Sequence, residues 1–274
     1  MPFEIQDYLS SLRVRKSKHT IRAYTSDLAQ FSSWCKGNNV DMLNATRHDI
    51  NVFLSIFLTE LTEEKRTLAR KRSCLSSFYK YLELEGKTSN NPVLKVEGFR
   101  VTRRKPDFLT KDEIWHLRQL CSTDVLSLFE FLLATGARES EVSALNWNQV
   151  NFEKVEVLLF GKGEKERFVP FSRRVYGLLG NMTRTSQAVF TNKYGQRLNP
   201  GMIYYRIRKL RKFLGRNLYP HLLRHTFATH LVDGGATIAD VQSLLGHESL
   251  ATTSIYTHPT EALKERYQSI MDNL

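Results

Sequence analysis

The chain has 274 residues, of which 41% are hydrophobic and 25% charged, a composition typical of a globular protein with one large domain or two ordinary ones. It holds no run of about 18 apolar residues and no basic-then-apolar start with a small-residue cleavage site, so we expect neither a membrane-spanning nor a secreted protein. The net charge of +12 favours a polyanionic partner over a merely soluble basic protein.

The positive charge is clustered. Residues 154–224 hold sixteen Lys or Arg against three acids, an excess of +13, and residues 1–104 hold eighteen against eleven, an excess of +7. Clustering of this kind is typical of proteins that bind the phosphates of DNA or RNA.

The first hundred residues have helical periodicity. In the segment 20–35, Ile21, Tyr24, Leu28 and Phe31 recur at three- and four-residue steps, and Thr20 is the expected N-cap. The segment 62–86 opens with acids, carries apolar residues along one face and ends at a glycine. Its opposite face carries Arg66, Arg70, Lys71 and Arg72.

Residues 90–106, "NNPVLKVEGFRVTRRKP", have no periodicity and contain Asn-Pro, a glycine and a basic run, which is typical of a linker. We therefore predict a helical N-terminal domain over 1–100, a linker over 101–106 and a second domain over 107–274.

The second domain begins with a predicted capping box made by Thr110 and Glu113. A buried helix follows, ended by Gly136, and residues 155–171 read as a strand, a glycine-containing turn and a second strand. Helices are then expected over 202–215, 222–235, 237–246 and 260–274. The predicted fold is mainly α, with a small antiparallel β-sheet in the C-terminal domain.

The three cysteines, Cys35, Cys74 and Cys121, are odd in number, far apart and without CxxC spacing. This fits reduced thiols in the cytoplasm and gives no signal for a disulfide or a metal site. His221 and His225 stand at i and i+4, but no glutamate lies between them as in HExxH, so we expect no metal. The pattern GxxxxGK[ST] is absent, so we expect no use of ATP.

A tyrosine near the C-terminus raises a question about chemistry. Tyr256 stands nine residues after His247 in "LGHESLATTSIYTHPT". If its phenol attacked a phosphodiester, it would need a proton acceptor, because a free phenol has a pKa of about 10. The phosphoryl group would need forked cationic donors, and the leaving 5′ oxygen would need a proton donor.

The sequence offers a candidate for each need. Arg138 follows a helix break, with Glu141 one turn further on and able to orient it. His221 and Arg224 share a helix face at i and i+3. The remaining candidates are Lys162 in the hairpin turn and His247 just after a helix-ending glycine. Each alone also fits a plain structural interpretation: a surface arginine, a solvated helix face, or ordinary turn chemistry.

Taken together, four segments resemble the signature boxes of the tyrosine recombinase (phage integrase) family. They are, in order, "TGARESEVSAL", "GKGEKERFVPF", "HLLRHTFATHL" and "LLGHESLATTSIYTH". The length and two-domain layout are most similar to the Xer branch. The boxes cover residues 134–258, and the N-terminal half resembles the family's core-binding domain. Ala137 stands where a larger apolar residue is common in the family, a departure that touches no catalytic role.

The resemblance implies a site-specific recombinase that acts through a covalent 3′-phosphotyrosine without metal, ATP or any cofactor. Arg138 and Arg224 would clamp the scissile phosphate, with Glu141 supporting the first. Lys162 would protonate the leaving oxygen, and His221 would accept the tyrosine proton. His247 would donate to a non-bridging oxygen, and Tyr256 would be the nucleophile.

The helix expected over 202–215 has an apolar stripe and leaves five cations outward: Arg206, Arg208, Lys209, Arg211 and Lys212. We favour contact with DNA backbone or major groove over a solvated basic face, and extend this to Arg66, Arg70, Lys71 and Arg72. The expected picture is a two-domain clamp around duplex DNA.

The resemblance also implies a partner and an assembly: double-stranded DNA with a specific recombination site, bound by a homo-tetramer on two sites, with no membrane. A paralogous recombinase or a DNA-translocating motor is a further candidate partner. The expected location is cytoplasmic and nucleoid-associated. The last helix either docks on its own domain or exchanges between protomers.

Four readings of the function remain open at this stage. They are Xer-like chromosome-dimer resolution, integration and excision of a mobile element, type IB topoisomerase-like nicking and closing, and DNA binding without catalysis. The last explains the charge but not the six candidate catalytic residues.

Overall fold

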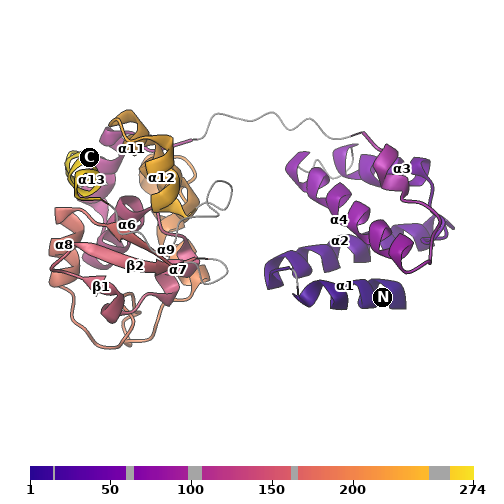
Figure 1. The fold of residues 1–274 in the computed structure, drawn as a ribbon, viewed down its shortest axis with the longest axis horizontal. Helices are drawn as coiled ribbons and strands as arrows, with labels where there is room; N and C mark the ends of the chain where they lie inside the picture. Colours follow the sequence, from indigo (N-terminus) through magenta and orange to yellow (C-terminus); the bar gives the residue numbers. More distant parts are fainter. Residues whose placement is uncertain (15, 60–64, 98–106, 162–165, 247–259) are drawn as a thin grey trace. The chain divides into compact units, whose positions relative to one another are not determined.

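The computed structural model describes residues 1–14, 16–59, 65–97, 107–161, 166–246 and 260–274. The chain divides into two compact units, Met1–Arg103 and Arg104–Leu274, each with its own hydrophobic core (Figure 1). None of the helices in the described ranges has the length and apolar content that a bilayer crossing requires.

The first unit is helical, as predicted. Its helices are α1 (Phe3–Ser11), α2 (Lys18–Gly37), α3 (Arg47–Thr59) and α4 (Lys65–Leu84), with 3₁₀ turns at Leu12–Val14 and Pro92–Lys95. An aromatic cluster fills the core, in which Phe31 and Phe53 pack edge to face with ring centroids 5.0 Å apart. The hydroxyl of Tyr79 donates to the backbone oxygen of Met42 at 2.7 Å, so the buried phenol is satisfied.

The N-cap of α2 is Ser17, and the prediction of Thr20 was wrong. Ser17 has extended backbone angles, and its hydroxyl accepts the N–H of Thr20 at 3.2 Å. Thr20 is therefore the third residue of the helix. Both residues are good caps, and the apolar periodicity that begins at Ile21 does not show how far the helix extends before it.

Lys71 does not lie on an exposed basic face of α4, and the prediction that it contacts DNA is wrong. Only 2% of its surface is exposed. Its ammonium lies 3.4 Å from the buried carboxylate of Asp27 on α2 and 4.1 Å from the centroid of the Phe57 ring. A buried carboxylate needs cationic partners, and Asp27 pairs with both Arg70 and Lys71.

The second unit is mainly helical with one small sheet. Its helices are α5 (Lys111–Leu120), α6 (Thr123–Thr135), α7 (Glu139–Ala144), α8 (Arg173–Gly180), α9 (Pro200–Lys209), α10 (Arg211–Leu214), α11 (Pro220–Asp233), α12 (Ile238–Leu245) and α13 (Glu261–Asp272). The helix α6 is buried along most of its length and packs against α8, α9 and α11. This central helix explains the continuous apolar run in the sequence.

The sheet has three antiparallel strands in the order β1 (Val150–Asn151), β2 (Glu156–Phe160) and β3 (Glu166–Pro170). The hairpin β2–β3 was predicted, but β1 was not, because two residues are too few to show alternation. In the register, Val157 faces Val169 and Leu159 faces Arg167. The buried face of the sheet therefore includes one arginine, and β3 contacts α12 and α13.

The basic helix predicted over 202–215 is divided at Leu210 into α9 and α10. The N–H of Leu210 bonds to the carbonyl of Ile207, three residues back, which tightens the chain into a turn. The predicted apolar side is confirmed at Ile203, Ile207 and Leu210, all of which are buried.

The last helix, α13, docks on its own unit. Tyr267 is fully buried, and its hydroxyl donates to the carbonyl of Ala134 at the end of α6. The ammonium of Lys264 lies 3.1 Å from the buried carboxylate of Glu156 on β2. In this chain the C-terminal helix therefore completes the core beside α6 and the sheet.

A tight turn at Gly136 joins α6 to the segment that carries Arg138. Its φ of 58° lies in the left-handed region, as predicted for a helix-ending glycine. A Cβ atom there would lie 2.6 Å from the Phe227 ring on α11 and 2.8 Å from Leu245 on α12. Glycine is needed at this position both for its backbone angles and for the close approach of two helices.

We expect Gly136→Ala to destabilise the protein by about 2–4 kcal/mol, because a left-handed alanine and a steric overlap act together. The matched control is Gly215→Ala, since Gly215 has a φ of 65° with nothing within 4 Å of its added Cβ. The control has only the backbone cost, about 1–2 kcal/mol. Denaturant unfolding of the full chain measures both, and equal losses would contradict the close approach.

Candidate active site

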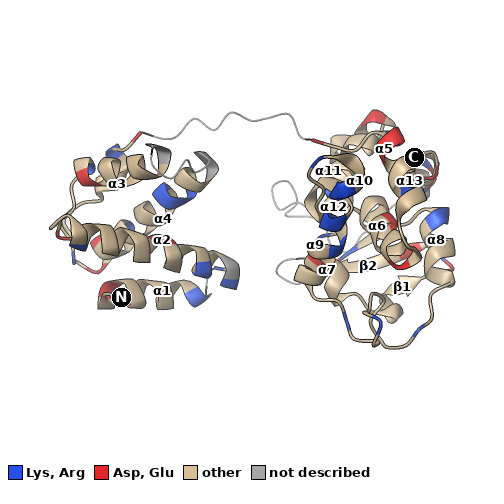
Figure 2. Ribbon diagram, turned by 180° about the vertical axis from the view of Figure 1, so that it is seen from behind, with Lys and Arg blue, Asp and Glu red and all other residues tan. Residues whose placement is uncertain are grey.

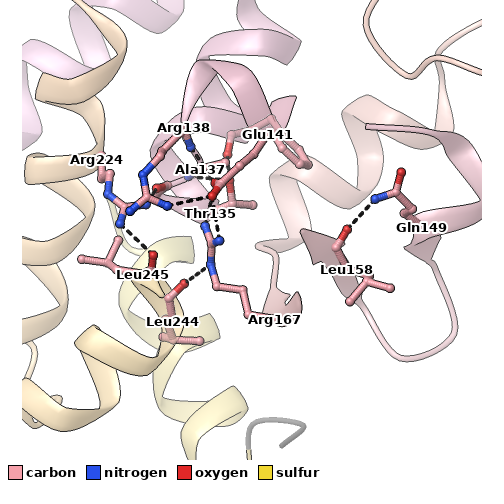
Figure 3. Close-up of polar contacts among 12 residues, drawn as sticks. Thr135, Ala137, Arg138, Glu141, Gln149, Leu158, Arg167, Arg224, Leu244 and Leu245 are labelled. Carbon is pink, nitrogen blue, oxygen red and sulfur yellow. Dashed lines mark hydrogen bonds and ion pairs between the residues drawn. The ribbon is translucent and has the colours of Figure 1, made fainter. Parts of the chain in front are cut away.

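The residue before α7 is Arg138, and it is held by a residue one turn further on. Its backbone N–H donates to Oε2 of Glu141 at 2.8 Å, and its Nη1 donates to Oε1 at 2.9 Å (Figure 3). The Glu141 side chain is 2% exposed, whereas that of Arg138 is 36% exposed. The local pattern of a capping box therefore places a buried carboxylate beneath a guanidinium that keeps contact with solvent.

A third charged residue, Arg167 on β3, completes this group, and the sequence analysis did not predict it. Its Nη1 and Nη2 donate to the two oxygens of Glu141 at 2.9 and 2.8 Å (Figure 3). One signal could have found it. Arg167 is two residues before Val169 and shares its strand face, and a cation on a buried face requires an acid.

Glu141 is ionised in this setting. Burial by itself raises the pKa of the carboxyl, but the hydrogen bonds and charge of Arg167, followed by those of Arg138, outweigh burial and lower the pKa below its ordinary value. The carboxylate offsets part of the charge of two guanidinium groups that lie close together.

Arg224 on α11 is 3% exposed, and backbone carbonyls hold its guanidinium. Nη1 donates to the carbonyl of Gly136 at 2.7 Å, and Nη2 donates to that of Leu245 at 2.7 Å. Arg224 thus joins the ends of α6 and α12. Burial, and then the charges of Arg138 and Arg167, lower its pKa to about 9, so it stays a cation at neutral pH.

His221 lies one turn before Arg224 on α11 and is exposed. Its ring is close to that of His225, with centroids 4.6 Å apart and the planes at 76°. Partial burial, followed by the charges of His225 and Arg224, lowers the pKa of His221 below its ordinary value. The imidazole is therefore neutral at pH 7 and able to accept a proton.

The structure brings together Arg138, Glu141, His221 and Arg224, four of the seven residues that the sequence analysis assigned to this site. The other three, Lys162, His247 and Tyr256, lie outside the described residues. Described residues lie close to two of them in the sequence. Gly246, which ends α12, directly precedes His247, and β3 begins four residues after Lys162. Within the described ranges, no group of three or more His, Cys, Asp or Glu side chains is arranged to hold a metal.

The predicted DNA-contact residues of the second unit lie on α9 and α10, where Lys and Arg gather in Figure 2. Four of them, Arg208, Lys209, Arg211 and Lys212, are exposed, and Arg206 is half-buried. Most of the predicted cations of α9 and α10 therefore reach solvent.

In the first unit, cations of the predicted basic face of α4 bind other groups of the protein. Nε and Nη2 of Arg72 donate to the carbonyl of Val96 at 3.1 and 2.7 Å, and Arg70 pairs with Asp27. The side chain of Arg66 lies outside the described residues. Arg70 and Arg72 are both half-buried, and the side chain of Arg70 is 39% exposed.

Comparison with known proteins identifies the family. Residues 107–262 match the model of the phage integrase family, and residues 5–86 match the phage integrase N-terminal SAM-like domain. The chain belongs to the phage integrase family of tyrosine recombinases. It is a tyrosine-type site-specific recombinase, an enzyme that breaks and rejoins DNA.

Several proteins are similar to this recombinase over nearly the full length. Tyrosine recombinase XerC of Lacticaseibacillus casei is 38% identical over 96% of this chain and 95% of the relative. Tyrosine recombinase XerD of Oceanobacillus iheyensis is 33% identical over 98% of each. A lambda integrase tetramer bound to a Holliday junction has a similar fold, with a TM-score of 0.74 and 17% identity over 93% of this chain and 78% of the integrase.

The buried carboxylate of this recombinase generates a testable effect on stability. We expect Glu141→Gln to lower the free energy of unfolding by about 3 kcal/mol at pH 7, because it leaves the buried Arg167 without an anion. The folded-state pKa of Glu141 is depressed, so its contribution is present above the unfolded pKa and is lost as pH falls through the folded value.

Urea unfolding of both proteins at neutral and at acid pH measures this effect. The advantage of the wild type should shrink in acid. An advantage that stays constant with pH would contradict the ionised, arginine-bound state of Glu141.

Proposed function

We propose that this recombinase cuts a DNA strand by attack of Tyr256 on a phosphodiester held between Arg138 and Arg224. The observation that carries the proposal is the pair of guanidinium groups fixed on one frame by Glu141 and the carbonyls of Gly136 and Leu245. Two forked cations at one place match the oxygens of a phosphate.

In the proposed step the phenol oxygen of Tyr256 forms a bond to phosphorus, and the bond from phosphorus to the 5′ oxygen breaks. His221 takes the tyrosine proton, and Lys162 gives a proton to the leaving 5′ oxygen. His247 donates to a non-bridging oxygen. The guanidinium groups of Arg138 and Arg224 neutralise the charge that develops on the phosphoryl group.

The product is a 3′-phosphotyrosine and a free 5′ hydroxyl. Attack of a 5′ hydroxyl from a second strand on this ester rejoins the DNA and releases Tyr256. Because the energy of the broken bond is kept in the ester, the reaction needs no nucleotide, and the cations provided by the chain serve in place of a metal ion.

The finer role we propose is Xer-like resolution of chromosome dimers. Support comes from near full-length similarity to relatives named XerC and XerD. Excision or integration of a mobile element uses the same chemistry and is the alternative. We further propose that both units grip a site of duplex DNA and that a tetramer assembles on two such sites; a lambda integrase of similar fold, which is a tetramer bound to a Holliday junction, supports this. We place the enzyme in the cytoplasm, on the nucleoid.

Tyr256→Phe tests the nucleophile. We expect wild-type protein, incubated with fragmented host DNA without metal or ATP and then denatured, to retain covalently linked DNA, and the variant to retain none. Sequencing the trapped ends distinguishes one specific site, expected of a recombinase, from many sites, expected of a topoisomerase-like enzyme. Adducts in the phenylalanine variant would show that another residue is the nucleophile.

The pH dependence of cleavage tests His221. The lowered pKa keeps the imidazole neutral, so the single-turnover cleavage rate should fall only at pH values below the ordinary pKa of histidine, where His221 becomes protonated. His225→Gln removes a charge that lowers this pKa and should move the acid limb to higher pH. If the fall in cleavage rate at acid pH persists unchanged in His221→Gln, a residue other than His221 is the proton acceptor.

A further inference from the structure

Arg167 occupies an unusual place for a cation. It lies in β3 opposite Leu159, which is 1% exposed, and its own side chain is 8% exposed. Its Nε, Nη1 and Nη2 all donate to groups of the protein itself. Its function must therefore be sought in what it binds inside the protein.

Three of the five N–H donors of Arg167 are used on two different elements. Two of them donate to the two oxygens of Glu141 on α7 at 2.9 and 2.8 Å. The third, Nε–H, donates to the carbonyl of Leu244 at the end of α12, at 2.7 Å. The planar fork fixes the directions of all three bonds together, which an ammonium cannot do.

The contact with Glu141 determines how Arg138 is held. A carboxylate has about four acceptor positions, and here four bonds occupy them: two from Arg167, one from the Arg138 guanidinium and one from the Arg138 backbone N–H. With Arg167 in place, Glu141 cannot turn to grip Arg138 with both oxygens. The Arg138 guanidinium binds Glu141 through Nη1 alone, and among the described residues its other side-chain donors have no further hydrogen-bond partner, which leaves them for a phosphate.

The contact with Leu244 determines where Arg224 is held. Arg167 and Arg224 bind the successive carbonyls of Leu244 and Leu245. Gly246 lies against Arg167, since a Cβ there would be 3.2 Å from its Cδ. The end of α12 therefore rests on both arginines, and a shift of Arg167 moves the carbonyl that binds Arg224.

We propose that Arg167 is a positioning residue, which keeps Glu141 from pairing fully with Arg138 and sets the spacing of Arg138 and Arg224 for one phosphate. The inference deepens the proposed function and rests on it for the identity of the ligand. The alternative is that the Arg167–Glu141 pair stabilises the fold and does nothing more.

The chain offers a matched control for that alternative. Arg118 on α5 forks onto Glu130 on α6, with side chains 8% and 2% exposed, the same values as for Arg167 and Glu141. This second pair makes no contact with Arg138 or Arg224 among the described residues. Arg118→Lys and Arg167→Lys thus each remove a two-bond fork onto a buried glutamate at equal burial and keep the charge, and Arg167→Lys also removes the bond to Leu244.

The first readout is single-turnover formation of the tyrosine–DNA adduct, with the Kd for the same DNA measured in parallel. We expect Arg167→Lys to slow cleavage by about 100-fold with little change in Kd, the effect of a small misplacement in an active site. Arg118→Lys should cleave within about threefold of wild type even where it loses similar thermal stability. Cleavage lost equally in both variants, or a Kd that weakens in step with the rate, would overturn the proposal.

The second readout is a double-mutant cycle. If Arg167 acts through Arg138, Arg167→Lys should slow an Arg138→Ala protein much less than it slows wild type. If the fold losses in cleavage rate caused by Arg138→Ala and by Arg167→Lys multiply in full in the double variant, the proposal is overturned.

The third readout needs no activity. The side-chain Nε–H NMR signal of Arg138 in the free full-length protein, assigned by its loss in Arg138→Lys, should shift in Arg167→Lys and stay in place in Arg118→Lys. A signal unchanged in both variants would overturn the proposal. Wild-type protein that forms no adduct would count against the proposed function, and the NMR comparison then decides on Arg167 by itself.

Discussion

The carboxylate of Glu141 is the constraint on which the site depends. Two guanidinium groups at close range repel each other by a few kcal/mol at the effective dielectric of a protein, about 20. Glu141 lies between Arg138 and Arg167, binds both and remains ionised because their hydrogen bonds and charges outweigh its burial. One anion between two cations leaves a net positive charge, which is what an incoming phosphate requires.

The ends of helices supply the rest of the frame. The last carbonyls of a helix have no partner within it and carry its negative dipole end. The end of α6 offers Gly136 to Arg224, and the end of α12 offers Leu244 to Arg167 and Leu245 to Arg224. The bonds that satisfy these helix ends also hold the arginines, so fold stability and active-site geometry rest on the same contacts.

Local signals predicted much of this structure, and long-range contacts account for what they missed. The capping box at Thr110 and the left-handed turn at Gly136 depend on neighbouring residues, so the sequence showed them. The partners of Lys71 and Arg167 lie on elements that are distant in the sequence. Periodicity alone therefore predicted that Lys71 is exposed and gave no reason to single out Arg167. Spacing also indicated the pairing of Arg138 with Glu141, one turn apart, but could not show that a third charge shares the carboxylate.

The most direct test of this account is a crystal structure of the Tyr256→Phe protein bound to its own cleavage site in duplex DNA, where the strand stays intact. We expect one phosphate at the cleavage position, with oxygens within hydrogen-bond distance of both Arg138 and Arg224, while Glu141 still binds Arg138 through a single side-chain nitrogen. A phosphate bound by other cations, or an Arg138 turned fully onto Glu141 and away from the DNA, would contradict this expectation.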